Sequence, residues 1–303
     1  MELKKCATPM VAAAALCAAS VSQASLFSST FDDASSADDF LVARVTGSND
    51  VITFGFDYGA LGISEAPSTP IGAAATRGLF LQANRSAPGA INGINVMAAS
   101  NGVLLNFAQN IDVTFDLWMG VGADLASGTE IALFGINKTN ENSVNRRPGA
   151  AQSGADGVWF HASGDGGFGA TSTIPNSRDV VAYVDNTIVG RLDNLEEPLA
   201  SIFPAQGNLP AGALGNRWVT VRIQEIGNEV RMSFNGTQVF SFVNTGATAG
   251  TVFLGYQDPF SGSIPNDTDN FFAVYDNLTV VPEPATMAAL GLGVLALMRR
   301  KRK

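Results

Sequence analysis

Strict alternation of apolar and polar residues constrains this chain more than any other feature. The segment 111–118 reads IDVTFDLW, in which apolar residues at the odd positions alternate with Asp, Thr and Asp. A repeat of two residues is the period of a β-strand that buries one face. The segments 218–224, WVTVRIQ, and 230–234, VRMSF, alternate in the same way. The sequence therefore predicts antiparallel sheets whose strands each contribute one face to a core.

Turn residues between these segments indicate how the strands connect. Gly227-Asn228 separates the second and third segments, and Asn235-Gly236 follows the third. Asn-Gly favours a type I′ hairpin turn because both central residues need positive φ, so 238–243 is expected to be the returning strand. Further strands are expected at 51–56, 79–83, 130–137, 158–162, 180–184, 251–256 and 271–280. With no long amphipathic pattern between them, the expected fold is an all-β antiparallel sandwich.

Charge and cysteine content narrow the functional classes. The segment 25–281 carries 11 basic and 25 acidic residues, a net charge of −14, and Lys138 is its single lysine. An acidic surface repels phosphate backbones, so nucleic acid is not an expected partner. Cys6 and Cys17 both precede this segment, so it has no disulfide and depends on its hydrophobic core. Leu16 is not the small residue expected before a lipidated Cys17.

The first 24 residues have the three parts of a secretory signal peptide. Lys4 and Lys5 form the basic start, residues 10–19 form a short apolar stretch, and Ser22-Gln23-Ala24 is a small-x-small cleavage site. An N-terminal anchor is the alternative, but the stretch is well short of the roughly 20 residues that a membrane span needs. We therefore expect cleavage after Ala24 and export of the remainder.

The C-terminus combines three features in a fixed order. Pro282-Glu283-Pro284 is followed by an apolar run at 285–298 and by five Lys or Arg residues at 299–303. The basic end should stay on the cytoplasmic side of a membrane. As a helix the run would be about 21 Å long, which is short of the roughly 30 Å of a hydrocarbon core. We therefore expect this segment to insert into the membrane only transiently. An ordinary C-terminal tail anchor is the alternative.

Together these features resemble the PEP-CTERM sorting signal of Gram-negative bacteria. The resemblance implies that Pro282, Glu283 and Pro284 are recognised by exosortase, a membrane-embedded protease-transpeptidase that removes the tail. It also implies a transient tether to the inner membrane, followed by a location at the cell surface or outside the cell. The expected organisation is a signal peptide at 1–24, a β-sandwich at 25–280 and a sorting segment at 281–303.

The body has a second resemblance, carried by the order of its last strands. The segments 218–243, 251–256 and 272–280 are similar to the C-terminal half of concanavalin A-like and laminin-G-like jelly rolls, in which the final strand returns beside the first. The stretches 56–63 and 156–160 also resemble a recurring, uncharacterised type of PEP-CTERM body. These similarities imply a jelly-roll β-sandwich, flanked by the signal peptide and a short C-terminal apolar helix.

A search for catalytic residues gives no convincing candidate. His161 is the only histidine, and no G-x-S-x-G segment accompanies it. Sugar-cleaving relatives of the fold carry paired acidic residues on one strand, whereas Glu225 and Glu229 flank a turn. We therefore expect a non-enzymatic protein without catalytic or cofactor-binding residues.

Two binding features are left. Asp165, Asp267 and Asp269 lie in Gly- and Asn-rich segments that could supply oxygen ligands for calcium, although turn chemistry explains the same residues. Trp118 falls on the polar side of its strand and is expected to be exposed, whereas Trp159 and Trp218 are expected in the core. The favoured interpretation is an exported protein associated with glycans or exopolysaccharide. A structural surface protein without a ligand and a carbohydrate-active enzyme are the alternatives.

Overall fold

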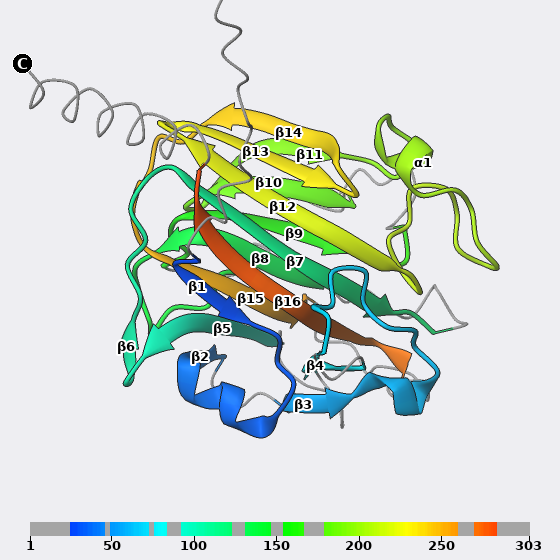
Figure 1. The fold of residues 1–303 in the computed structure, drawn as a ribbon. Helices are drawn as coiled ribbons and strands as arrows, with labels where there is room; N and C mark the ends of the chain where they lie inside the picture. The colour runs from blue at the N-terminus through cyan, green and yellow to red at the C-terminus, as the bar shows by residue number, and fades with distance from the viewer. Residues whose placement is uncertain are drawn as a thin grey trace, which may run out of the picture.

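Two antiparallel β-sheets pack face to face, and the hydrophobic core fills the space between them (Figure 1). The computed structural model describes residues 25–45, 49–72, 76–83, 92–122, 131–146, 154–166, 179–259 and 270–283. The predicted antiparallel β-sandwich is confirmed, because both sheets are built of antiparallel pairs throughout their described strands.

The first sheet, sheet A, contains both the first and the last strand of the chain. Its strands are β1 (Phe27–Ser29), β3 (Val51–Asp57), β4 (Arg77–Gln82), β7 (Ile111–Gly120), β12 (Trp218–Ile226), β13 (Glu229–Phe234), β14 (Thr237–Val243) and β16 (Phe272–Pro282). They lie in the order β14-β13-β12-β7-β16-β4-β3, and β1 pairs with β16. The final strand therefore returns beside the first, as the jelly-roll resemblance implies.

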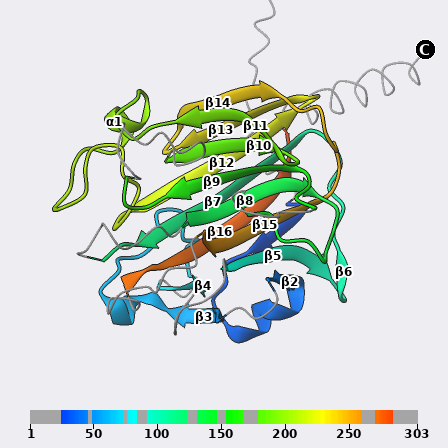
Figure 2. The same cartoon turned by 180° about the vertical axis from the view of Figure 1, so that it is seen from behind.

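The second sheet, sheet B, lies behind sheet A in Figure 1 and in front of it in Figure 2. Its strands are β2 (Phe40–Arg44), β5 (Asn92–Ser100), β6 (Val103–Leu104), β8 (Ile131–Lys138), β9 (Val158–Ser163), β10 (Val180–Val184), β11 (Thr187–Leu192) and β15 (Thr251–Asp258). They lie in the order β11-β10-β9-β8-β15-β5-β2, and β6 pairs with β5. The described helices are short: η1 (Ala34–Asp39), η2 (Tyr58–Leu61) and α1 (Leu199–Ile202).

Strand β7 shows how the alternation builds the core. Its odd-numbered residues from Ile111 to Met119 are buried between the sheets, so its even-numbered residues point to the outer face. Tyr275 of β16 connects the two sheets directly, because its hydroxyl lies 3.0 Å from the carbonyl oxygen of Leu133 and 2.7 Å from that of Gly255. Both acceptors lie in sheet B.

The predicted hairpins form where their turn residues lie. Asn235 and Gly236 have φ values of 49° and 80°, as a type I′ turn requires. Strand β5 shows why some strands were not predicted. Ile94 and Val96 face the core, while Met97 packs in a second apolar cluster on the other side of the sheet. A strand buried on both faces has no alternation to detect.

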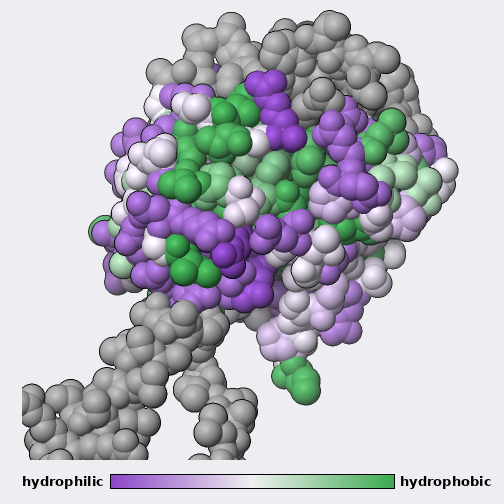
Figure 3. Space-filling model, turned by 90° about the horizontal axis from the view of Figure 1, so that it is seen from above, coloured by the Kyte–Doolittle hydropathy of each residue, from purple (hydrophilic) through white to green (hydrophobic). Residues whose placement is uncertain are grey.

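Among the described residues, β14 and β11 are the outermost strands of their sheets on one side of the sandwich. Figure 3 looks onto this side, where apolar side chains gather among polar ones. Val243 of β14 is 63% exposed and Val189 of β11 is 38% exposed. The phenyl ring of Phe240 packs so closely over Gly190 that a Cβ there would lie 2.8 Å from it. The two edges therefore meet across the core.

Candidate functional site

Trp118 and Trp218 form a half-buried aromatic pair on the outer face of sheet A. The register of β7 and β12 places them opposite each other. Their rings meet edge to face, with centroids 5.7 Å apart and 68° between the planes, a favourable geometry because the positive ring edge meets the negative ring face. Trp118 is half-exposed, as its strand position predicts. Trp218 was predicted to lie in the core, and this prediction is wrong. The side chain of Val219 points into the core, so that of Trp218 points to the outer face.

The segment 58–69 holds Trp218 in place. Its Tyr58 ring meets the Trp218 ring edge to face at a centroid distance of 5.2 Å. The Trp218 indole Nε1 donates a hydrogen bond of 2.7 Å to the Ser64 carbonyl oxygen. These two contacts fix the orientation of one indole of the pair, so the aromatic surface is preformed.

A buried carboxylate anchors the same segment from below. Asp116, on the outer face of β7, accepts hydrogen bonds from the Ser68 backbone N–H at 2.8 Å and the Ser68 hydroxyl at 3.1 Å. It also accepts from the Thr220 hydroxyl at 2.8 Å and from the Asn277 amide at 3.0 Å. Four donors satisfy the carboxylate, which makes its burial tolerable.

A second carboxyl, Asp276 of β16, lies opposite Asp116 in the sheet. It accepts hydrogen bonds from the Tyr58 hydroxyl at 2.9 Å and the Asn277 backbone N–H at 2.7 Å. Burial, together with the charges of Asp116 and Asp32, raises the pKa of Asp276 to about 7. Asp116 and Asp276 are at most 2% exposed. They therefore act as anchors of the segment 58–69 and are closed to a polymeric substrate.

On the outer face of sheet B, Trp159 and Tyr183 are closed off, unlike the indole pair of sheet A. The rings of Trp159 and Tyr183 stack in parallel, 3.9 Å apart, and the Trp159 indole donates to the Asp185 carbonyl oxygen at 2.7 Å. His161 lies on the same face as Trp159, as expected, and its Nδ1 is 3.2 Å from the Tyr183 hydroxyl. All three rings are fully buried, and Val144 packs against their cluster.

The two glutamates considered as a catalytic pair lie on opposite faces of sheet A. Glu225 is buried and accepts hydrogen bonds of 3.0 to 3.1 Å from the amides of Asn137 and Asn244. Burial raises its pKa. Glu229 lies on the outer face and pairs with Arg231 at 2.8 Å. This geometry differs from a glycosidase pair, which needs both carboxyls on one surface.

Of the residues considered for calcium, Asp165 lies in the described ranges. Asp165 follows β9, is buried, and accepts a hydrogen bond of 2.5 Å from the Ser163 hydroxyl. Asp267 and Asp269 lie outside the described residues. Among the residues that the structure describes, no three of His, Cys, Asp and Glu cluster as metal ligands would.

The sorting motif begins inside the fold. Strand β16 runs to Pro282, two residues beyond the boundary expected from the sequence, and the Glu283 backbone N–H donates to the Asn110 carbonyl oxygen at 2.8 Å. Glu283 is only 7% exposed. Hydrogen bonds to Asp112 raise the pKa of Arg222, and the charge of Glu283 adds to this effect. The start of the motif is thus part of the sheet.

The remaining parts of the two ends lie outside the described residues. This applies to Pro284, to the apolar run at 285–298 with its basic end, and to the signal peptide with its cleavage site after Ala24. Within the ranges that are described, the structure has no helix long and apolar enough to cross a membrane.

Comparison with protein families matches residues 280–303 to the PEP-CTERM protein-sorting motif. The C-terminus is a PEP-CTERM sorting motif. The match covers Pro282, Glu283 and Pro284 and confirms the resemblance drawn from the sequence. The motif implies export and processing at the membrane. No curated protein matches the sequence of the chain.

Several solved structures resemble the body. A protein of unknown function with a galectin-like fold from Bacillus subtilis is 12% identical, with a TM-score of 0.44 over 86% of this chain and 96% of its own. The lectin UEA-II, complexed with galactose, is 8% identical, with a TM-score of 0.45 over 85% and 99%. The VIP36 exoplasmic/lumenal domain in its Ca²⁺- and mannose-bound form is 9% identical, with a TM-score of 0.39 over 67% and 78%. TM-scores this low carry no inference about ligands.

Proposed function

We propose that the exported body binds glycans without cleaving them, and that the surface formed by Trp118 and Trp218 receives a sugar ring. The observation that carries this proposal is the half-buried indole pair, which is flanked by polar residues of β7 and β12 and packs against a buried apolar cluster that includes Tyr58 and Phe272. A pyranose ring has an apolar face that stacks on an aromatic ring, while its hydroxyls stay in water or bond to polar neighbours. Because Tyr58 and Ser64 hold Trp218 before any ligand arrives, little ordering is needed on binding.

The charge of the body narrows the class of glycan. With a net charge of −14 over residues 25–281, the surface repels strongly anionic polysaccharides at low salt. A neutral or weakly charged exopolysaccharide of the producing cell is therefore the favoured ligand. An exopolysaccharide with a high uronate content would bind less well, and added salt would weaken that penalty.

The destination of the body follows from its two ends. An exosortase-type enzyme removes the tail after a transient hold in the inner membrane, and the body then remains at the cell surface or outside the cell. Intact-mass analysis of the exported protein tests this step. We expect a mature chain that begins at Ser25 and lacks the basic end, whereas an intact Lys303 would contradict removal of the tail.

Binding is tested with purified exopolysaccharide of the producer, by retention on a polysaccharide gel and by quenching of tryptophan fluorescence. We expect Trp118→Ala to weaken binding about tenfold, because one stacked ring contributes roughly 1 kcal/mol or more. Trp118→Phe should keep part of the affinity. Val189→Ala, which truncates an exposed side chain on β11, is the matched control and should bind like the wild type.

The same experiment separates the alternatives. Equal retention of the wild type and Trp118→Ala would exclude this surface, and no retention at all would favour a structural protein without a ligand. Release of reducing sugars would establish an enzyme. A chelator tests calcium, because loss of an Asp165- or Asp267-bound ion would lower both affinity and melting temperature.

A further inference from the structure

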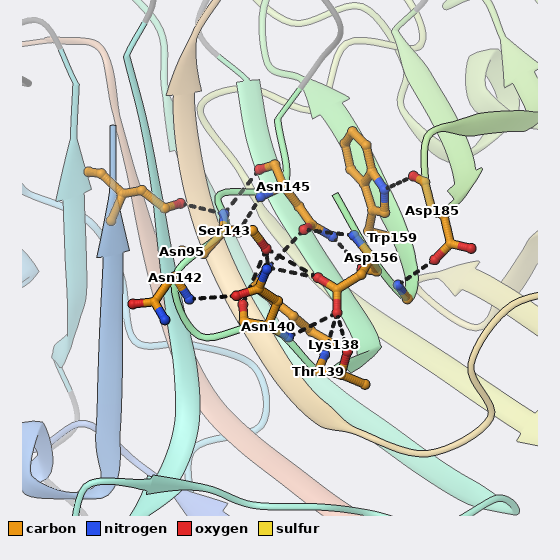
Figure 4. A network of polar contacts seen from close by, with 12 residues as sticks. Asn95, Lys138, Thr139, Asn140, Asn142, Ser143, Asn145, Asp156, Trp159 and Asp185 are labelled. Carbon is orange, nitrogen blue, oxygen red and sulfur yellow. Dashed lines mark hydrogen bonds and ion pairs between the residues drawn. The ribbon is translucent and has the colours of Figure 1, made fainter. Parts of the chain in front are cut away.

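The only lysine of the body is buried inside a polar cluster. Lys138, the last residue of β8, is 0% exposed. Its Nζ lies 2.8 Å from the Ser143 hydroxyl, 2.8 Å from Asn145 Oδ1 and 3.1 Å from Asp156 Oδ1 (Figure 4). Burial lowers the pKa of Lys138 against the raising effect of Asp156. An amine that loses its proton more readily is a better nucleophile.

The side-chain amide of Asn145 is held against this amine. Asn145 is also 0% exposed, and its backbone N–H donates to Asn95 Oδ1 at 2.6 Å. Its Nδ2 donates to the Asp156 carbonyl oxygen at 2.7 Å, and its Oδ1 accepts from the Asp156 backbone N–H at 3.3 Å. The carbonyl oxygen of the amide is thus polarised by two donors, the Lys138 ammonium and a backbone N–H.

Asp156 completes the arrangement as a proton acceptor. Burial favours its neutral form, but the charge of Lys138 and the donors of Thr139 outweigh burial and lower its pKa. Its second oxygen accepts from the Thr139 backbone N–H and hydroxyl at 2.5 and 2.7 Å and from the Asn140 N–H at 3.0 Å. A carboxylate fixed in this way next to Nζ can take up its proton.

From this geometry we infer that Lys138 and Asn145 react with each other to form an intramolecular isopeptide bond. Asp156 takes a proton from Nζ, whose lone pair then forms a bond to Asn145 Cγ. The backbone N–H of Asp156 stabilises the oxyanion of the tetrahedral intermediate. The Cγ–Nδ2 bond breaks, and Nδ2 leaves with protons from Nζ, which reach it through Asp156. The products are one amide and one ammonium ion, and the step needs no oxidant or reductant.

Such a bond would have a structural purpose in this chain. It would close the segment 138–145 into a ring and fix Val144, which packs over the closed face of sheet B. Because residues 25–303 contain no cysteine, this exported body cannot use a disulfide for the purpose. The inference does not depend on glycan binding.

Intact-mass analysis of the folded, exported protein tests the inference directly. We expect the wild type to be about 17 Da lighter than its sequence, the mass of one ammonia. Tandem mass spectrometry should find residues 138 and 145 joined in one cross-linked peptide. Lys138→Met, Asn145→Ala and Asp156→Ala should each show the full mass of their own sequence. Ser143→Ala removes one acceptor of Nζ and a hydroxyl bond of 3.3 Å to Asp156, but none of the three reacting groups. It is the matched control and should keep the cross-link.

Two results would overturn the inference. One is a folded wild type with the full sequence mass, even after prolonged incubation. The other is a mass loss that persists in Lys138→Met, because a succinimide at an Asn-Gly site such as Asn235-Gly236 also loses one ammonia. Mild alkaline treatment distinguishes the two, since it opens a succinimide and leaves an amide intact. Because the decisive measurement uses the wild type, poor folding of a variant does not affect it.

Discussion

The outer faces of the two sheets both carry tryptophan residues, but these differ in how far they are buried. On sheet A, Trp118 and Trp218 meet edge to face and stay half-buried. On sheet B, Trp159 stacks in parallel on Tyr183 and both are fully buried. In each case a connection folds over the face: 58–69 on sheet A, and the segment after β8 on sheet B.

The two connections differ in how much of the tryptophan surface they cover. The segment 58–69 is tied down by carboxyls of the sheet, Asp116 and Asp276, and its contacts leave the indole pair at the rim. The connection after β8 is tied down by Lys138, Asn145 and Asp156 and lies over the apolar cluster itself. Both connections thus cover an apolar cluster, but the one on sheet A leaves Trp118 and Trp218 half-exposed, whereas the one on sheet B leaves Trp159 fully buried.

The largest effect is expected on the closed face. Trp159→Ala would remove a fully buried ring and its hydrogen bond to Asp185, and should lower the free energy of unfolding by about 3–5 kcal/mol. Urea unfolding followed by circular dichroism measures this. A loss below about 1 kcal/mol would mean that Trp159 is accessible in solution, and would contradict the difference between the two faces.

The next effect concerns the anchors of the open face. In the folded state Asp276 keeps its proton up to a pKa of about 7, whereas the unfolded carboxyl releases it near 3.8. The folded state therefore binds more protons in this window, and its stability falls as the pH rises from about 4 to 7. Asp276→Asn has no such titrating proton. As the pH rises from 4 to 8, its free energy of unfolding should therefore increase relative to that of the wild type by roughly 2–4 kcal/mol. Denaturant titrations at both pH values test this, and a difference independent of pH would contradict it.

A smaller loss of stability is expected at the aromatic pair. Trp118→Ala truncates a half-buried ring and should cost about 1–2 kcal/mol, well below the cost of Trp159→Ala. Its main effect should be on glycan retention. If both tryptophan variants were equally destabilised, the two faces would not differ as the structure indicates.

The smallest effect is expected from Ser68→Ala. It removes the hydroxyl bond to Asp116 at 3.1 Å and leaves the backbone bond at 2.8 Å in place, so it should cost about 0.5–1 kcal/mol. Hydrogen exchange of the segment 58–69 should rise, while exchange of the connection after β8 should not change. A change in both would show that the two faces are coupled.

The sequence predicted most strands of the two sheets but not the segments that cover their outer faces. Alternation identified β7, β12 and β13, and Asn235-Gly236 identified the hairpin that follows them, because these signals are local. It did not identify β5, which is buried on both faces. Trp218 was misplaced because its size was taken to favour the core, although the alternation of Val219, Val221 and Ile223 puts it on the polar side of its strand.

The candidate site was predicted in part. Trp118 followed from its place on β7, but its neighbours Tyr58 and Ser64 come from a distant segment with no strand or helix pattern long enough to place it. Asp276 gave a partial signal, since it interrupts the apolar run that begins at Phe271, whereas Asp116 lies at an ordinary polar position of its alternating strand. Their contacts with residues 48 and 218 positions away could not be read from spacing.

Strand β16 extends into the sorting motif, which places the aromatic pair far from the start of that motif. Glu283 is bonded to Asn110, and the apolar run begins at 285, so a single residue, at most about 3.6 Å of chain, separates the sheet from the run. Trp118 lies seven residues along β7 from Ile111, or roughly 23 Å. The aromatic pair therefore lies at the end of β7 opposite to the start of the sorting motif.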